Sequence, residues 1–511
     1  MANAQFFQIA APAAGLNQED PPTMIGGDET PRVQNVRFRG GEVFKRRGYT
    51  TLMSASMAST PVLLNDFDRL AGSTTAMMAT LSNLYKWTGA TFTSVKSGLS
   101  GTVGGRHSAC TMNDTWIYTN GVDHVQVWTG TGNASDLAGG DDYQTPTYHL
   151  CRAVVTFADR LLLLGTNEDG TSYPYRIRWS ELGKTDEYDT SAGGGYFDLE
   201  GDPTGAQCGV PIGAWLAVYC GNRIYIGQYV GGLAVFRFDV AVPNKGTLAP
   251  RTVIDLGFDH IFMGQDDVYL FNGTALTGVG GRIRDDLFKN VSRTNFPKCF
   301  AMLNEDEHLY YLYVPYGESG GKINRQYVYD YQQDRWTIDT IENLTAASAL
   351  ELGSRGTIDE LPSDKTIDEM DHEPIDALGG FEGRNFRCFA NSGGYIFKDD
   401  LVSLDDNGTA IDARWESKDL VLDDRYVNHY KRIIEIMFEA KGASVDVAYS
   451  TDLGATWTEA GDQTLVSDYA RYSFYVDTVG RQLRLRFKND NSGERFWLRW
   501  LGVRYTVGSD R

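Results

Sequence analysis

Hydrophobic and polar positions alternate in short runs along this chain, and the runs come in pairs. The stretch VIDLGFDHIFMGQDDVYLFNGT at 253–274 is typical: an apolar run, a polar turn at 265–267, and an alternating run closed by Asn272-Gly273. Asn-Gly accepts the positive backbone angles of a tight turn, so the stretch predicts one antiparallel hairpin. A lone hairpin cannot bury its apolar face, and it therefore needs neighbours of its own kind.

The same pattern predicts seven hairpins, at 78–89, 109–121, 153–165, 215–227, 261–273, 300–314 and 386–398. Most are spaced by roughly 40 to 50 residues, which is the blade length of β-propellers. The predicted fold is therefore all-β, with a β-propeller of about seven blades at residues 56–404. Evenly spaced hairpins also fit a stack of β-sandwiches, which is the alternative architecture.

Different patterns flank the predicted propeller. Residues 1–55 show little periodicity before NVRFRGGEVFKRRGY, so we expect an extended N-terminal arm and then a hairpin turning at Gly40-Gly41. Residues 405–511 alternate over longer strands and predict a separate C-terminal β-sandwich. An acidic stretch at 357–376 is expected to be an exposed loop within the propeller, because its charges repel and it offers little apolar surface.

Composition restricts the classes of function. The 511 residues include 47 basic and 67 acidic side chains, and the formal charge of −20 disfavours tight binding of nucleic-acid phosphates. The N-terminus lacks a basic leader and no apolar window approaches ~18 residues, so we expect a protein made in the cytoplasm without stable membrane insertion. The six cysteines form no C-x-x-C pair and are expected to be buried free thiols: Cys110, Cys151, Cys208, Cys220, Cys299 and Cys388.

The most specific short motif is STDLGATW, which matches the Asp-box S-x-D-x-G-x-T-W of sialidases and other propellers. Its defining residues are Ser450, Asp452, Gly454, Thr456 and Trp457. Asp452 can accept backbone N–H bonds, Gly454 supplies unusual backbone angles and Trp457 packs underneath. The motif therefore predicts a structural turn without chemistry. A sialidase is expected to repeat the box in several blades, whereas this chain has it once.

Other signals of chemistry are weak. The chain has no H-E-x-x-H or phosphate-loop motif, and we predict no enzyme activity, no cofactor and no metal site. NDNSGE at 489–494 is a partial match to a calcium loop and is better explained as a hairpin tip. Arg484, Arg486 and Lys488 alternate with apolar residues, so they share one face that is either solvated or an interface for an acidic neighbour.

The N-terminal NVRFRGGEVFKRRGY, the D-x-x-Y-x-F-N-G ending at 266–273 and the order of propeller and sandwich resemble the tail nozzle, or tail-stabilisation, proteins of short-tailed bacteriophages. The resemblance implies a structural virion protein, with six copies forming a tube in the tail below the portal and adaptor rings. It also implies transient passage of double-stranded DNA without specific binding. The alternatives are a propeller-type glycosidase or sialidase, with the sandwich binding carbohydrate, and a receptor-binding tail protein.

Overall fold

The computed structural model describes residues 4–10, 12–70, 74–137, 150–232, 234–352, 386–400 and 402–508, and the acidic stretch at 357–376 lies outside them. Strands dominate the described residues, as the sequence predicts. Helix is limited there to α1 (Arg284–Asn290) and short 3₁₀ turns, among them η2 (Pro250–Thr252), η3 (Arg293–Lys298) and η7 (Asp424–Tyr426). None of the described helices has the length and hydropathy needed to cross a membrane.

Five four-stranded antiparallel sheets follow one another, each with its strands hydrogen-bonded in chain order. Their strands are β8 (Pro61–Phe67), β9 (Thr75–Thr80), β10 (Asn83–Trp87) and β11 (Phe92–Ser97); β12 (Ser108–Met112), β13 (Thr115–Thr119), β14 (Gln126–Trp128) and β15 (Ser135–Asp136); β16 (Leu150–Phe157), β17 (Arg160–Glu168), β18 (Thr171–Trp179) and β19 (Gly195–Asp198); β20 (Ala206–Ile212), β21 (Trp215–Cys220), β22 (Arg223–Gly231) and β23 (Val235–Pro243); and β24 (Ile254–Asp255), β25 (His260–Met263), β26 (Val268–Phe271) and β27 (Leu276–Gly278).

A longer, nine-stranded sheet comes next. It contains β28 (Phe300–Asn304), β29 (Leu309–Val314), β30 (Ile323–Asp330), β31 (Arg335–Leu350), β32 (Phe386–Asn391), β33 (Ile396–Asp399), β7 (Tyr49–Thr51), β34 (Asp405–Asp406) and β35 (Thr409–Ala410). The first part of β31 pairs with β30, and its last part pairs with β32. Asn343 lies between the two parts with a left-handed φ of 53°. One strand therefore ends one four-stranded group and begins the next.

All seven predicted hairpins are present: β9 with β10, β12 with β13, β16 with β17, β21 with β22, β25 with β26, β28 with β29 and β32 with β33. Some of them join the first and second strands of a four-stranded group and others the second and third, which explains their uneven spacing in the sequence. At Asn272-Gly273 only Gly273 is left-handed, because the Asn272 side chain itself accepts the N–H groups of Thr274 and Ala275.

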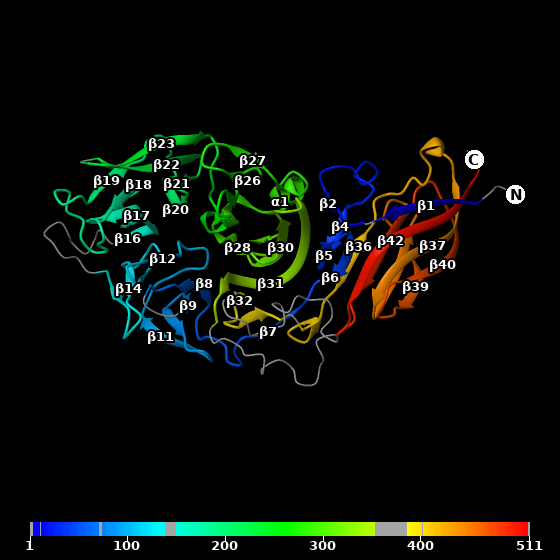
Figure 1. The fold of residues 1–511 in the computed structure, drawn as a ribbon, viewed down its shortest axis with the longest axis horizontal. Helices are drawn as coiled ribbons and strands as arrows, with labels where there is room; N and C mark the ends of the chain where they lie inside the picture. The colour runs from blue at the N-terminus through cyan, green and yellow to red at the C-terminus, as the bar shows by residue number, and fades with distance from the viewer. Residues whose placement is uncertain are drawn as a thin grey trace.

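The first strands of these groups form a closed ring. Each first strand contacts the next one in the order β8, β12, β16, β20, β24, β28 and β31. The ring closes because β31 contacts β8 again. Figure 1 shows the sheets arranged around a common centre. β7, from near the N-terminus, pairs with β33 and completes the last group with a strand from the other end of the sequence. Such closure is the arrangement of β-propellers, whereas a stack of sandwiches has no reason to return to its first strand.

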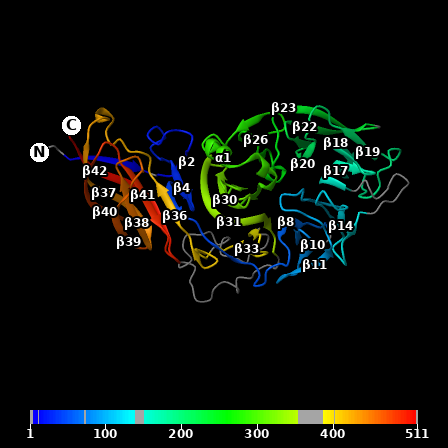
Figure 2. The same ribbon diagram turned by 180° about the vertical axis from the view of Figure 1, so that it is seen from behind.

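Two further sheets lie beside the ring and form what we call the C-terminal unit (Figures 1 and 2). One sheet has the order β40-β37-β42-β6-β5, with β1 also paired to β42, and the other has the order β39-β38-β41-β36-β4. Their strands are β1 (Gln5–Ala10), β4 (Arg32–Gln34), β5 (Val36–Arg39), β6 (Glu42–Lys45), β36 (Ala413–Glu416), β37 (Lys431–Gly442), β38 (Ser444–Ser450), β39 (Thr458–Thr464), β40 (Ala470–Gly480), β41 (Arg484–Asn489) and β42 (Phe496–Val507).

The N-terminal strands lie inside this unit. β5 and β6 form the predicted hairpin, with Arg39 opposite Glu42 across Gly40-Gly41. β1 and β6 pair with β42, and β4 pairs with β36. The short parallel pair β2 (Gly15–Leu16) and β3 (Glu29–Thr30) lies between β1 and β4 in the chain. The structure thus departs from the expected arm beside a separate domain: strands within residues 5–10 and 32–45 belong to the same sheets as strands within 413–507, whereas β2 and β3 form a sheet of their own.

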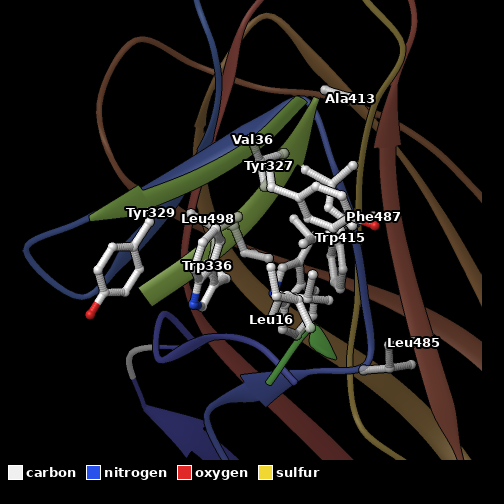
Figure 3. Packing of buried hydrophobic residues seen from close by; sticks show 14 of the residues in the cluster. Leu16, Val36, Tyr327, Tyr329, Trp336, Ala413, Trp415, Leu485, Phe487 and Leu498 are labelled. Carbon is white, nitrogen blue, oxygen red and sulfur yellow. The ribbon is translucent and has the colours of Figure 1, made fainter. Parts of the chain in front are cut away.

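One hydrophobic cluster runs from the ring into the C-terminal unit (Figure 3). Trp336 and Tyr327 on the ring side, Leu16 and Val36 from the N-terminal segment, and Trp415 from β36 all belong to it and are buried. The Trp336 indole is hydrogen-bonded as well, because its Nε1 donates to the carbonyl oxygen of Val279 at 2.8 Å. Contact across this boundary therefore excludes water in the way that a domain core does.

Buried ion pairs also hold the ring and the C-terminal unit together. Arg37 on β5 forms a bidentate pair with Asp339 on β31, at 2.8 and 2.6 Å. Arg46 forms a second bidentate pair with Asp406, at 2.8 and 2.6 Å, and its Nε lies 3.7 Å from Asp339. Asp339 is 1% exposed. Burial alone would raise the pKa of Asp339, but the Arg37 and Arg46 guanidinium groups hold it below its usual value.

We expect Asp339→Asn to lower the free energy of unfolding by about 3 to 5 kcal/mol, because it leaves two buried guanidinium groups without their shared carboxylate. Chemical denaturation of the full chain measures the loss. The control is Asp136→Asn, which breaks a largely exposed pair with Lys96 (2.9 Å) and should cost less than about 1 kcal/mol. Equal, small losses in the two variants would contradict a stabilising role for the buried network.

Candidate functional site

The Asp-box residues form the turn between β38 and β39. Asp452 Oδ1 accepts the Ser450 hydroxyl at 2.6 Å and the Thr456 backbone N–H at 2.9 Å, and its Oδ2 accepts the Thr456 hydroxyl. Ser450 Oγ in turn accepts the Gly454 N–H at 2.9 Å. These hydrogen bonds lower the pKa of Asp452 to about 2, with the Ser450 bond contributing most. Both carboxylate oxygens are thus occupied within the turn.

Gly454 and Trp457 complete the turn. Gly454 has a φ of +83°, and a Cβ there would lie 2.7 Å from Nη1 of Arg484. A side chain at this position would be strained and would also collide with that arginine. Trp457 is half-buried, and the Arg486 guanidinium lies 4.5 Å from its ring centroid. The arrangement holds a turn and leaves no group of the motif free for catalysis.

The basic stripe is neutralised by carboxylates of the same sheet and of the loops beside it. Arg484 binds Asp419 at 2.8 Å, Arg486 binds Glu459 at 2.9 Å, and Lys488 is paired with Asp490. Because each cation already has a carboxylate partner, the stripe offers little unbalanced charge to an acidic neighbour. Of the two interpretations left open by the sequence, this pairing favours a solvated face over an interface for an acidic neighbour.

The partial calcium loop at 489–494 is the hairpin tip between β41 and β42, and it holds an ammonium group. Lys45 Nζ donates to Asn489 Oδ1 at 2.7 Å and to the carbonyl oxygen of Asn491 at 3.0 Å. The Lys45 side chain is fully buried, and burial lowers its pKa although Asp405 and Glu494 act in the opposite direction. A side chain of the N-terminal segment therefore takes the place that the motif suggested for a metal ion. The described residues contain no cluster of three metal-ligating side chains.

The cysteines carry no chemistry that the described geometry reveals. All six are free, four of them buried and Cys110 and Cys208 half-buried. Burial raises the pKa of the Cys110 and Cys151 thiols to about 12, so neither is a thiolate at neutral pH.

One end of the ring is covered by contacts that cross its centre. We call it the start end, because the first strands begin there. Arg251 in η2 donates from Nη2 to the Val62 carbonyl oxygen in β8 (2.7 Å) and to that of Thr345 in β31 (3.3 Å). Its guanidinium also lies 5.0 Å from the Phe300 ring in β28. Arg251 therefore links the beginning of the fifth sheet to the first strands of three other groups.

A glycine-rich loop before β12 adds a second crossing at the start end. A Cβ on Gly104 would lie 2.8 Å from Cγ of Lys298, which belongs to η3 just before β28. His107 anchors this loop, with Nδ1 2.9 Å from the Tyr118 hydroxyl and Nε2 2.9 Å from the Thr102 carbonyl oxygen. Burial and then the nearby Arg251 lower the pKa of His107 to about 4, so the ring is neutral at pH 7. With both crossings in place, the centre of the ring is not open at this end.

The opposite end of the ring is acidic. Asp66, near the end of β8, accepts the Glu351 backbone N–H at 2.9 Å through Oδ2, and its Oδ1 is buried without a hydrogen-bond partner. Burial, reinforced by the charges of Asp68 and Glu351, raises the pKa of Asp66 to about 7. This carboxylate lies at the seam where β8 meets β31 and the ring closes.

The outer side of the six-stranded sheet carries what we call the aromatic face: Phe6, Tyr469, Arg471, Tyr475 and Trp500. Phe6, which is 50% exposed, stacks on Trp500 with ring centroids 5.9 Å apart, and Arg471 lies 4.8 Å from the Trp500 centroid. Tyr469 is covered by the Arg499 guanidinium at 3.8 Å, and Tyr475 is 71% exposed. The alternation of these strands was evident in the sequence, but the joining of β1 to β42, which brings Phe6 onto Trp500, was not.

Replacing Asp452 tests the Asp-box turn. Because the folded-state pKa of Asp452 lies below its ordinary value, its contribution to stability is present above about pH 4 and is lost as the pH falls through about 2. Asp452→Ala should therefore lower the Tm at pH 7 and have a much smaller effect near pH 2. A Tm unchanged at pH 7 would show that the turn does not depend on these hydrogen bonds.

Asp66→Asn tests the seam of the ring, and its effect on stability should depend on pH in the opposite direction to that of Asp452→Ala. A raised folded-state pKa gives stability that is fully present below about pH 4 and is lost as the pH rises through about 7. The variant should have a higher Tm than the native chain at pH 8 and little difference at pH 4. Asp239→Asn, whose exposed carboxylate pairs with Arg237 in another sheet of the ring, is the matched control and should leave the pH dependence near pH 7 intact. Parallel Tm profiles of native and Asp66→Asn chains would contradict the assignment.

Comparisons with known proteins identify similar shapes only. No family model matches the chain, and no curated protein matches it in sequence. Among solved structures, virginiamycin B lyase from Staphylococcus aureus is 9% identical with a TM-score of 0.41, over 70% of this chain and 100% of its own. The Pan2 WD40 domain of Neurospora crassa is 7% identical with a TM-score of 0.39, over 70% and 97%. A CBM29-2 mutant complexed with cellulohexaose is 16% identical with a TM-score of 0.15, over 19% and 63%.

Proposed function

We propose that this chain is a structural virion protein, a subunit of the nozzle at the distal end of a short bacteriophage tail. In this proposal the ring is a seven-bladed β-propeller, the C-terminal unit is a β-sandwich, and six copies surround a passage through which the genome is retained and then ejected. The protein acts in the virion tail after assembly in the host cytoplasm, beside the portal and adaptor rings. It performs no enzymatic reaction.

The observation that carries the proposal is the way the N-terminal segment joins the two parts. Strands β5 and β6 belong to the C-terminal unit, β7 closes the ring, and buried ion pairs of Arg37 and Arg46 lie between them. A subunit that transmits load between neighbours must not bend between its parts, and a shared core with paired buried charges resists bending. The same rigidity gives no advantage to a catalytic domain with a loosely tethered binding module.

The route of the genome lies between copies in this proposal. Arg251 and the Gly104 loop cover the start end of the ring, so duplex DNA does not use the centre of a single subunit. A charge of −20 per chain favours a passage lined in part by carboxylates, which repel the DNA phosphates and let the duplex move without being held.

We assign contacts between copies to the aromatic face. Exposed aromatic and arginine side chains are enriched at the centres of protein interfaces, and Tyr475, Phe6 and Arg471 supply both kinds. The same composition favours the second candidate function, a receptor-binding tail protein, because aromatic rings on an open sheet also stack on sugars. The two candidates differ in what the face contacts.

We expect purified full-length protein, mixed with tail components, to form six-fold rings or tubes in electron micrographs. Tyr475→Ser should reduce assembly at least several-fold, because it removes an exposed anchor of the interface. Tyr395→Ser, which alters an exposed tyrosine of the ring away from the aromatic face (43% exposed, against 71% for Tyr475), is the control. Duplex DNA should show negligible binding to the isolated protein even at low salt. The nozzle proposal would be contradicted if the protein stayed monomeric under all these conditions. If the native chain then bound glycan and Tyr475→Ser did not, the receptor-binding function would take its place.

A further inference from the structure

Four cations from different parts of the ring gather at the start end. Arg106 lies two residues before β12, Arg152 lies near the beginning of β16, Arg251 is in η2 and Lys298 is in η3. Lys298 packs on Gly104 of the loop that leads to Arg106, and Arg251 acts on His107, the neighbour of Arg106. A Cβ on Gly121 would lie 3.0 Å from Cβ of Arg106 and 3.8 Å from the carbonyl oxygen of Cys151, the residue before Arg152, and the charge of Arg152 lowers the pKa of Arg106.

None of these four cations has an acidic partner among the described residues. Elsewhere in the described part of the ring, Arg176 and Arg178 bind Glu168 and Arg387 binds Asp399, whereas Arg160 is hydrogen-bonded to the carbonyl oxygens of Ser180 and Gly193. Arg106 makes no ion pair, and its Nη1 is buried without a hydrogen-bond partner. Burial, and then the charge of Arg152, lower the pKa of Arg106. In a chain with 20 more acidic than basic side chains, such a cluster is a local excess of positive charge that folding alone does not require.

The two arginines are held in place by packing. Gly121 has a φ of +77°, and a Cβ there would lie 3.0 Å from Cβ of Arg106. Gly165 has a φ of +64°, and a Cβ there would lie 2.8 Å from Cδ of Arg152. Arg152 Nη1 donates to the carbonyl oxygen of Thr204 at 2.7 Å, which fixes its guanidinium and leaves its other N–H groups for a ligand. The aliphatic parts of both arginine side chains thus pack against glycines, while their guanidinium groups have no carboxylate partner among the described residues.

We propose that Arg106 and Arg152 bind a phosphate-type oxyanion at the start end of the ring. A phosphate group brings a charge of about −1.5 to −2 and several acceptor oxygens, which match two adjacent guanidinium groups. It would satisfy the buried Nη1 of Arg106 and relieve the repulsion between the two arginines. Arg251 contributes attraction, but its Nη2 is already bonded to the Val62 and Thr345 carbonyl oxygens, so it is not a direct ligand through that atom. The site does not depend on the proposed role in a virion.

Inorganic phosphate is the probe that tests the site. Phosphate at millimolar concentration should raise the Tm of the full chain more than sodium chloride of equal ionic strength, because a ligand that binds only the folded state stabilises it. Arg106→Met and Arg152→Met keep the apolar stem on its glycine, and each should weaken phosphate binding by about tenfold or more in isothermal titration calorimetry. In chloride, Arg106→Met should not lower the Tm, because it removes one of two mutually repelling buried charges.

Arg237→Met is the matched control, because Arg237 is 67% exposed and already paired with Asp239 at 2.8 Å. This variant should bind phosphate as the native chain does. Equal Tm increments in phosphate and chloride, or full phosphate binding by Arg106→Met, would overturn the proposal. So would a short DNA duplex that binds through Arg106 and Arg152 while inorganic phosphate does not, since the cluster would then be a nucleic-acid contact.

Discussion

The N-terminal strands hold the ring and the C-terminal unit together, because one short stretch of chain is hydrogen-bonded into both. β5 and β6 extend a sheet of the C-terminal unit, and β7, four residues after β6, completes the last group of the ring. Between them Arg46 is bound to Asp406, and Arg37 reaches across to Asp339 on β31. Separating the two parts would expose these charges unpaired and break strand pairings on both sides, so their relative orientation is fixed by the same contacts that stabilise them.

The features predicted from sequence are those encoded by neighbouring residues. A hairpin needs only two alternating runs and turn residues, and all seven were found where Asn, Asp and Gly separate such runs. The turn at Gly40-Gly41 is another local feature of this kind. In contrast, Arg37 and Asp339 are 302 positions apart, and no pattern in either stretch indicates the other. The expected arm and the separate terminal domain followed from this limitation, because pairing between the two chain ends leaves no periodic signal.

The pairing of charged side chains likewise depends on residues that are distant in the sequence, although the charge pattern itself is local. The alternation of Arg484, Arg486 and Lys488 is visible in the sequence, yet each finds a carboxylate on its own sheet or the adjoining turn. Arg106, Arg152 and Arg251 look unremarkable along the chain and come together only when the ring closes. A formal charge of −20 therefore says little about any one surface. What decides binding is which charges remain unpaired after folding, and in the described residues these include cations at the start end and the acidic Asp66 at the other.

The claim on which this account depends is that the N-terminal strands are an integral part of both units and do not open independently of them. Hydrogen–deuterium exchange followed by mass spectrometry tests it directly, because slow exchange reports cooperative opening. Peptides covering residues 32–51 should exchange as slowly as those covering β37 in the C-terminal unit and β32 in the ring. Rapid exchange of residues 32–51 while β37 and β32 stay protected would show that the segment is a detachable arm, and would contradict the account.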